Sequence, residues 1–253
     1  MIPTLAADRL TVAGRGRARL AAVTVTFRPG LTVVVGPNGS GKTTLLRALL
    51  GLEPAVAGRA TLDGVGIQAL SPRRRAAALA WLPQDPPPEA GLTAREAVAA
   101  ARYRFDEPWP DALRAADAAL TEVGAAAHAA VPMDHLSGGE AQAVRFAALR
   151  AQEAPWWLLD EPGNHLDAAV QLALVARLRD RARDGGVLLV THDLTLLPHL
   201  GPARVLGLSA GAVAVDAPSD APDLPDQLGA LFGVRLLAWS DDGAVRWAIG
   251  GAR

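Results

Sequence analysis

A glycine-rich octapeptide at residues 36–43 constrains the fold of this chain more than any other stretch. It fits the spacing G-x-x-x-x-G-K-[ST] and lies between an apolar run at residues 31–35, which predicts a buried strand, and a helix-forming run at residues 44–50. A strand, a glycine-rich turn and a helix N-terminus form a phosphate-binding cradle, because glycines allow successive backbone N–H groups to point at one anion. The cradle consists of Gly36, Pro37, Asn38, Gly39, Ser40, Gly41, Lys42 and Thr43.

Lys42 is the single lysine of the chain, whose other basic residues apart from histidines are arginines. An ammonium is a compact point charge, whereas a planar guanidinium is too large for a tight cradle. We therefore expect Lys42 to reach the β- and γ-phosphates of a nucleoside triphosphate and the Thr43 hydroxyl to bind Mg²⁺, with Thr44 among the nucleotide contacts. A chance motif is the alternative, and the flanking strand and helix argue against it.

Composition excludes several classes of function. The chain has 253 residues, no cysteine and a net charge of −1, which excludes disulfides and cysteine-based zinc and argues against nucleic acid as the main partner. No apolar run approaches the roughly 18–20 residues of a membrane-spanning helix, and the N-terminus shows no signal-peptide pattern. We expect a cytoplasmic protein that meets a membrane only through a partner.

The order of elements predicts an α/β fold with a helical insertion. Short strands are expected within residues 3–35 and again after the cradle, while the stretch from about residue 84 to residue 152 reads as helices without a strong strand. We predict one domain, 1–253, with a core of 1–83 and 153–253 and a helical subdomain of 84–152. Residues 85–88 and 216–225 read as proline-rich linkers, and a hairpin is expected near the C-terminus.

Two adjacent carboxylates follow the buried strand predicted at residues 155–159. Asp160 is expected to hold Mg²⁺ through water, and Glu161, which points the other way, is expected to accept a proton from an attacking water. The alternative is an acidic turn without catalytic function. Because the chain also has a phosphate cradle, we favour the interpretation in which Asp160 binds the metal and Glu161 acts as the base.

A second glycine-rich helix start lies at residues 136–140. Ser137, Gly138 and Gly139 precede a predicted helix and form another N-terminus suited to an anion. Taken alone, this stretch is an ordinary loop and cap. Together with a triphosphate cradle, it raises the question of what the second helix start binds.

The motifs taken together resemble the ATP-binding subunit of an ABC transporter. They occur in the family's order: the cradle, Gln84 after a strand, the Leu-Ser-Gly-Gly-Glu element at residues 136–140, Asp160 with Glu161, and then Asp167 and His192. The resemblance covers nearly the whole chain. It implies a P-loop NTPase (RecA-like) core with an N-terminal antiparallel β part and an inserted α-helical subdomain, acting on ATP with Mg²⁺.

The resemblance also implies roles for single residues. Two copies of the chain would stack head to tail, so that Ser137, Gly138 and Gly139 of one copy contact the γ-phosphate held by the other. Glu161 would be the base, and His192 would contact the γ-phosphate. Gln84 would touch Mg²⁺ or water, and Asp167 would lie at the dimer seam. As alternatives, His192 is a surface histidine and Asp167 caps a helix.

Three features of the sequence depart from the family pattern. Residues 12–17 hold no aromatic side chain to stack on adenine, Ala143 stands where the family usually has arginine, and Gly163 stands where serine or threonine is common. An arginine plane or an aliphatic contact would have to replace the stacking. The preference for ATP over GTP therefore stays open.

Residues 62–64, 70–73, 82–84 and 92–98 are similar to those of importers for iron–siderophore, haem or cobalamin. The resemblance thus implies a homodimer on the cytoplasmic face of the inner membrane that powers a separate integral membrane permease. An exporter subunit is the alternative within the family. Outside transport, the alternatives are a soluble ATPase acting on DNA or ribosomes and a P-loop kinase, which would lack the element at residues 136–140.

Overall fold

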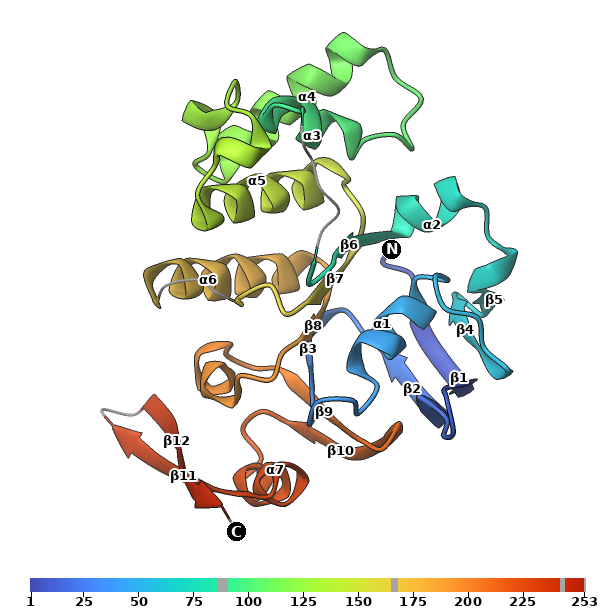
Figure 1. Cartoon of the computed structure of the whole chain (residues 1–253), viewed down its shortest axis with the longest axis vertical. Helices are drawn as coiled ribbons and strands as arrows, with labels where there is room; N and C mark the ends of the chain where they lie inside the picture. Colours follow the sequence, from blue (N-terminus) through green and yellow to red (C-terminus); the bar gives the residue numbers. More distant parts are fainter. Residues whose placement is uncertain (86–90, 165–167, 242–243, 253) are drawn as a thin grey trace. The chain divides into compact units, whose positions relative to one another are not determined.

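The computed structural model describes residues 1–85, 91–164, 168–241 and 244–252 (Figure 1). The chain divides into two compact units, Met1–Leu70 with Leu172–Arg253 and, inserted between them, Ser71–Gln171. The predicted helical subdomain, 84–152, lies within the second unit, which also holds two strands. Each unit is described by itself.

The first unit contains the predicted antiparallel β part. Its strands pair in the order β2 (Leu20–Phe27), β1 (Leu5–Val12), β4 (Ala57–Leu62) and β5 (Val65–Gly66), followed by the short 3-10 helix η1 (Ile67–Ala69). Buried and exposed residues alternate along β2, as in a strand with one face toward a core. This confirms the strands expected before the cradle.

The same unit holds a mainly parallel group of strands around β3 (Gly30–Val35). β3 pairs in parallel with β8 (Gly186–Val190) on one side and with β9 (Arg204–Ser209) on the other, and β10 (Ala212–Pro218) adds to β9 as an antiparallel edge. β3 and β8 are apolar almost throughout and buried, which is typical of strands covered on both faces. Helix α1 (Lys42–Leu49) follows β3, while most of α6 (Ala168–Asp184) and the 3-10 helix η4 (Leu194–His199) also belong here.

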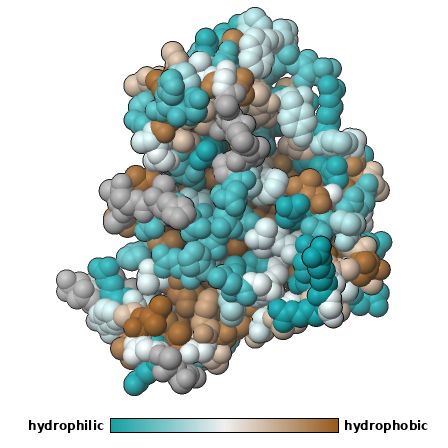
Figure 2. Space-filling model, in the orientation of Figure 1, coloured by the Kyte–Doolittle hydropathy of each residue, from teal (hydrophilic) through white to brown (hydrophobic). Residues whose placement is uncertain are grey.

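The C-terminal part corrects one prediction. Residues 216–225 are not a linker, because β10 continues to Pro218 and helix α7 (Leu224–Phe232) begins at Leu224. Leu224 and Leu228 are buried, and the left-handed Gly233 ends the helix. The predicted hairpin is confirmed as β11 (Val234–Asp241) and β12 (Ala244–Ala252), although its expected turn residues 242 and 243 lie outside the described residues. Figure 2 shows hydrophobic surface gathered over α7.

The second unit is built from helices and one pair of parallel strands. β6 (Leu79–Leu82) pairs in parallel with β7 (Trp156–Asp160), and α2 (Pro72–Ala78) starts at the N-cap Ser71, whose hydroxyl accepts a hydrogen bond from the Arg74 N–H. The other helices are α3 (Ala94–Ala100), α4 (Trp109–Glu122) and α5 (Gly138–Ala151), with the 3-10 turns η2 (Ala126–His128) and η3 (Met133–His135).

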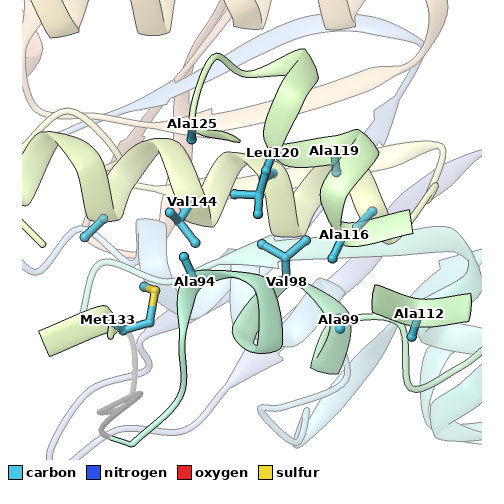
Figure 3. Close-up of a cluster of buried hydrophobic side chains, with 13 residues drawn as sticks. Ala94, Val98, Ala99, Ala112, Ala116, Ala119, Leu120, Ala125, Met133 and Val144 are labelled. Carbon is cyan, nitrogen blue, oxygen red and sulfur yellow. The ribbon is translucent and has the colours of Figure 1, made fainter. Parts of the chain in front are cut away.

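The helices of the second unit share a core of small side chains. Val98 of α3, Leu120 of α4 and Val144 of α5 meet at its centre, surrounded by alanines (Figure 3). Alanine side chains are small and let helix axes approach closely, so α3, α4 and α5 pack against one another around this core. Trp156 and Trp157 of β7 are buried core residues.

Candidate nucleotide-binding site

The predicted cradle is a glycine-rich turn between β3 and α1 in the first unit. Gly36, Gly39 and Gly41 adopt left-handed φ angles of 151°, 75° and 105°. A Cβ atom at Gly36 would lie 2.3 Å from the Leu208 carbonyl oxygen, and one at Gly41 would lie 2.5 Å from the Arg19 carbonyl oxygen. Glycine is therefore required at both positions by backbone angle and by space.

The start of α1 is suited to an anion. Its N-cap residue is Gly41, and no side chain of the described residues caps the first turn, so backbone N–H groups at this helix end are available to a phosphate. The Ser40 hydroxyl is buried and makes no hydrogen bond within the described residues. These features fit the phosphate chain of a nucleotide.

Lys42 is the first residue of α1 and is buried. Its ammonium Nζ donates hydrogen bonds to the carbonyl oxygens of Gly36 at 2.8 Å and Pro37 at 3.3 Å. The side chain therefore folds back over the turn, with its positive charge inside the cradle. This is the position from which an ammonium reaches the phosphates of a bound triphosphate.

His192 lies close to the cradle in the topology of the first unit. It comes two residues after Val190 of β8, which pairs with Val34 of β3, so both strands end at the same sheet edge. The Thr191 N–H donates to the Val34 carbonyl oxygen at 3.1 Å, and the Asp193 N–H donates to the Thr191 hydroxyl at 3.0 Å. These bonds hold the turn, and the His192 side chain is exposed.

Gln84, Asp160 and Glu161 lie in the second unit. Leu82 of β6 pairs with Leu159 of β7, so Asp160, the last residue of β7, and Gln84, two residues after β6, lie at the same ends of neighbouring parallel strands. Asp160 is buried, whereas Gln84 is exposed. A carboxylate at a strand end supplies the kind of oxygen ligand that Mg²⁺ prefers, so Asp160 fits the metal role expected of it.

Glu161 has a left-handed backbone with φ 51°. A non-glycine residue in this region costs on the order of 1–3 kcal/mol, and such strain clusters at functional sites. The strained turn is anchored by Gln142, a buried residue of α5 whose side-chain amide donates to the Pro162 carbonyl oxygen at 2.9 Å. Sequence reasoning did not identify this anchor, and its only signal is a polar residue on the buried face of a helix.

The second glycine-rich helix start is confirmed as the N-terminus of α5. Ser137 is the N-cap, and it forms a capping box with Glu140: the Ser137 N–H and hydroxyl donate to Glu140 Oε2 at 2.8 and 2.7 Å. Ser137 and Gly138 are exposed. A Cβ atom at Gly138 would meet no atom of the described residues within 4 Å, so there is open space at this position.

The predicted site residues thus fall into two groups. The cradle, Thr44 and His192 belong to the first unit, while Gln84, Ser137, Gly138, Gly139, Asp160 and Glu161 belong to the second. The predicted seam residue Asp167 lies outside the described residues. In the described part of the chain, no helix is both long and apolar enough to span a bilayer.

Strand, glycine turn and helix, set in an α/β fold, define a P-loop nucleoside triphosphatase. More particularly, residues 20–164, more than half of the chain, match the family model described as ABC transporter. The chain belongs to this family and is an ATP-binding ATPase, as the resemblance implied.

The relatives agree with this assignment. Hemin import ATP-binding protein HmuV of Nocardia farcinica is 40% identical over 80% of this chain and 71% of its own length. HmuV of Bordetella pertussis is 34% identical over 91% of this chain and 92% of its own length. Cobalamin import ATP-binding protein BtuD of Halobacterium salinarum is 35% identical over 94% of this chain, which spans 61% of that protein.

Solved structures confirm the fold. A metal-chelate type ABC transporter in an inward-facing conformation has a TM-score of 0.83 at 21% identity, with 100% of this chain and 98% of that chain covered. The dimeric bacterial ABC transporter cassette MJ0796 has a TM-score of 0.77 at 22% identity, with 86% and 99% covered.

Proposed function

We propose that two copies of this chain hydrolyse ATP with Mg²⁺ and thereby power a separate membrane permease that imports haem, cobalamin or an iron–siderophore. The observation that carries the proposal is the pair of glycine-flanked helix N-termini, those of α1 and α5, in one chain. The names of the relatives support import, because both HmuV and BtuD are described as import ATP-binding proteins.

The first helix tip would hold the nucleotide. Lys42 and the backbone N–H groups of residues 38–44 would bind the phosphates, with the Lys42 ammonium turning from the two carbonyl oxygens it now contacts toward the β- and γ-phosphates. The Thr43 hydroxyl, Asp160 and Gln84 would hold Mg²⁺, which neutralises phosphate charge when bound. Oxygen donors, with water and phosphate completing the shell, are the ligands that this ion prefers.

The hydrolytic step would use residues from both copies of the chain. Glu161 would accept a proton from water as the water oxygen bonds to the γ-phosphorus and the bond to the β-phosphate oxygen breaks. His192 would stabilise the γ-phosphate. Ser137, Gly138 and Gly139 of the second copy would donate to the same phosphate, so that ATP closes the dimer and hydrolysis reopens it. The ligand shifts this equilibrium only through its different affinity for the closed and open forms.

The proposed partner is tested by purification from native membranes. We expect the chain to co-purify with an integral membrane protein and to sit at the cytoplasmic face of the inner membrane through that protein alone. Salt-sensitive co-purification with nucleic acid instead of a membrane protein would contradict the proposal. Transport of haem, cobalamin and a ferric siderophore into vesicles that hold the purified complex then distinguishes the cargoes and the direction.

A further inference from the structure

The chain contains two nearly identical capping boxes, one at α3 and one at α5. Glu96 Oε2 accepts from the Thr93 N–H and hydroxyl, both at 2.8 Å. Glu140 Oε2 accepts from the Ser137 N–H and hydroxyl at 2.8 and 2.7 Å. Because the two boxes match so closely, a difference between their surroundings points to a role beyond helix capping.

The difference is a histidine. The Nε2 atom of His128 lies 3.7 Å from Glu140 Oε1, the carboxylate oxygen that does not accept from Ser137. At this distance the two atoms do not form a hydrogen bond, and they form an ion pair only when the imidazole carries a proton. Among the described residues, no basic side chain pairs in this way with Glu96. His128 therefore lies beside the capping box of Ser137 and Glu140, and Ser137 is the serine proposed to contact phosphate.

Backbone bonds fix the position of His128. It is the last residue of η2, its N–H donates to the Ala125 carbonyl oxygen at 3.0 Å, and its own carbonyl oxygen accepts from the Val131 N–H at 2.8 Å. The next residues bond to the start of α3, where the Ala94 N–H donates to the Val131 carbonyl oxygen at 2.9 Å. The imidazole is thus carried on a segment held at several points and is not on a free loop.

Glu140 creates an electrostatic conflict at the tip of α5. The hydroxyl and backbone hydrogen bonds of Ser137 hold the pKa of Glu140 below its ordinary value, and His128 lowers this pKa further. The carboxylate is therefore ionised at neutral pH. It suits the positive end of the helix, but it repels any phosphate that approaches the same helix end.

Binding of a phosphate would also change the hydrogen bond from the Ser137 hydroxyl to Glu140. An ionised phosphoryl oxygen only accepts hydrogen bonds, so Ser137 would have to turn its hydroxyl proton from Glu140 Oε2 toward the phosphate. Glu140 Oε2 would then keep only the Ser137 backbone N–H, and more negative charge would remain near the ligand. An imidazole beside Oε1 offsets that charge whenever it carries a proton.

We propose that His128 is a positioning residue for the phosphate contact of Ser137 and acts by offsetting the charge of Glu140. The inference rests on the proposed role of Ser137 at the γ-phosphate of the partner copy. Its direct consequence is energetic coupling between His128 and Glu140 that appears in the apparent affinity for Mg-ATP and not in the chemical step.

The test measures KM and kcat for Mg-ATP hydrolysis by the full chain. For His128→Ala we expect KM to rise about threefold, the size of a partly exposed charge pair, with kcat within about twofold. His128→Arg, which places a permanent positive charge at the same position, restores KM. His128→Gln keeps the approximate size without charge and replaces His128→Ala if that variant does not fold. Glu96→Gln, in the matched box, leaves KM unchanged.

A double-mutant cycle supplies the decisive comparison. Glu140→Gln keeps an acceptor for Ser137 but removes the charge, so adding His128→Ala to it should change KM no further. An unchanged KM in His128→Ala, or an equal rise in both backgrounds, overturns the inference. Ser137→Ala separates this failure from failure of the proposed function: if it hydrolyses normally, the phosphate contact itself is wrong.

Discussion

The side-chain amide of Gln142 donates a hydrogen bond to the Pro162 carbonyl oxygen at 2.9 Å, with both residues buried. Pro162 directly follows Glu161, whose left-handed backbone needs support from its surroundings. The bond ties the turn that carries the proposed base to the helix that carries the Ser137 tip, within one unit of the fold. Glu161 and Ser137 are therefore both held in place by helix α5.

We predict that Gln142→Leu loosens this turn. Because the buried Pro162 carbonyl oxygen loses its donor, the free energy of unfolding should fall by about 1–3 kcal/mol, and kcat should fall more than KM changes. Urea unfolding and steady-state kinetics measure both effects. Gln152→Leu is the control, since its amide bonds to the Ala148 carbonyl oxygen in the same helix but away from Glu161. Equal losses in the two variants would exclude a specific role for Gln142.

Glu161→Gln should stop turnover while ATP binding remains. The amide occupies the same space but accepts no proton, and loss of a general base lowers rates by about 10²- to 10⁴-fold. Equilibrium binding and size-exclusion chromatography with ATP should show binding and an accumulated dimer. Melting temperature should be unchanged, since the strained backbone is the same. Normal hydrolysis would remove Glu161 from the role of base.

The amine of Lys42 should be modified slowly and should be protected by nucleotide. It is buried and already bonded to two carbonyl oxygens. An amine-reactive reagent has only the N-terminus and Lys42 as targets, so mass spectrometry resolves the two and the N-terminus serves as the internal control. Mg-ATP should suppress modification of Lys42 alone. Equal modification with and without Mg-ATP would contradict the cradle assignment.

Gly139→Ala should abolish most ATPase activity without harming the fold. A Cβ atom at this position would lie 3.6 Å from Val170 Cγ2, an ordinary contact, and the backbone is not left-handed. The free energy of unfolding should therefore stay within about 0.5 kcal/mol. The added methyl group would occupy space that the phosphate held by the partner copy needs.

Gly66→Ala is the matched control, because it also has open space and an ordinary backbone but lies in β5. Hydrolysis should remain normal in this variant. If Gly139→Ala hydrolyses ATP as fast as Gly66→Ala does, no phosphate approaches the tip of α5 during turnover.

Acid should destabilise the chain through Glu107. The buried guanidinium of Arg102 binds this carboxylate through two hydrogen bonds, of 2.5 and 2.9 Å, and holds its pKa below the ordinary value of 4.5. A carboxyl group with a lowered pKa in the folded state stabilises the fold above its unfolded pKa. That stability is lost as pH falls through the lower folded value.

The melting temperature should therefore drop as pH falls below about 4.5, and Glu107→Gln should weaken this dependence while lowering the melting temperature at pH 7. Glu122→Gln is the control, because its pair with Arg150 is on the surface. A pH dependence that is identical in the two variants would exclude the Arg102–Glu107 pair as a cause.

Much of the fold follows from local patterns. The strand–turn–helix of the cradle and the capping boxes at Thr93 and Ser137 are set by residues near one another in sequence, so they were predictable. Helix α7 was missed because prolines and aspartates in residues 216–225 resemble a linker, although Leu224 and Leu228 already show helical spacing.

The roles of Gln142 and His128 depend instead on contacts between residues that are far apart in sequence. Gln142 meets Pro162 across 20 residues of sequence, and His128 meets Glu140 across a turn of the fold. Both contacts arise only when α5 packs in its unit, so no spacing rule identifies them. The roles of the site residues were predictable only as a set, because Gln84 or His192 alone is an unremarkable polar residue.

The confinement of Lys42 inside the cradle gives this chain a built-in spectroscopic reporter. Protein grown with isotope-enriched lysine would carry one enriched side chain, so its ε-methylene resonance needs no assignment by mutation. Because the adjoining ammonium contacts two carbonyl oxygens of the same turn, any ligand that displaces them changes the chemical shift of that single resonance directly.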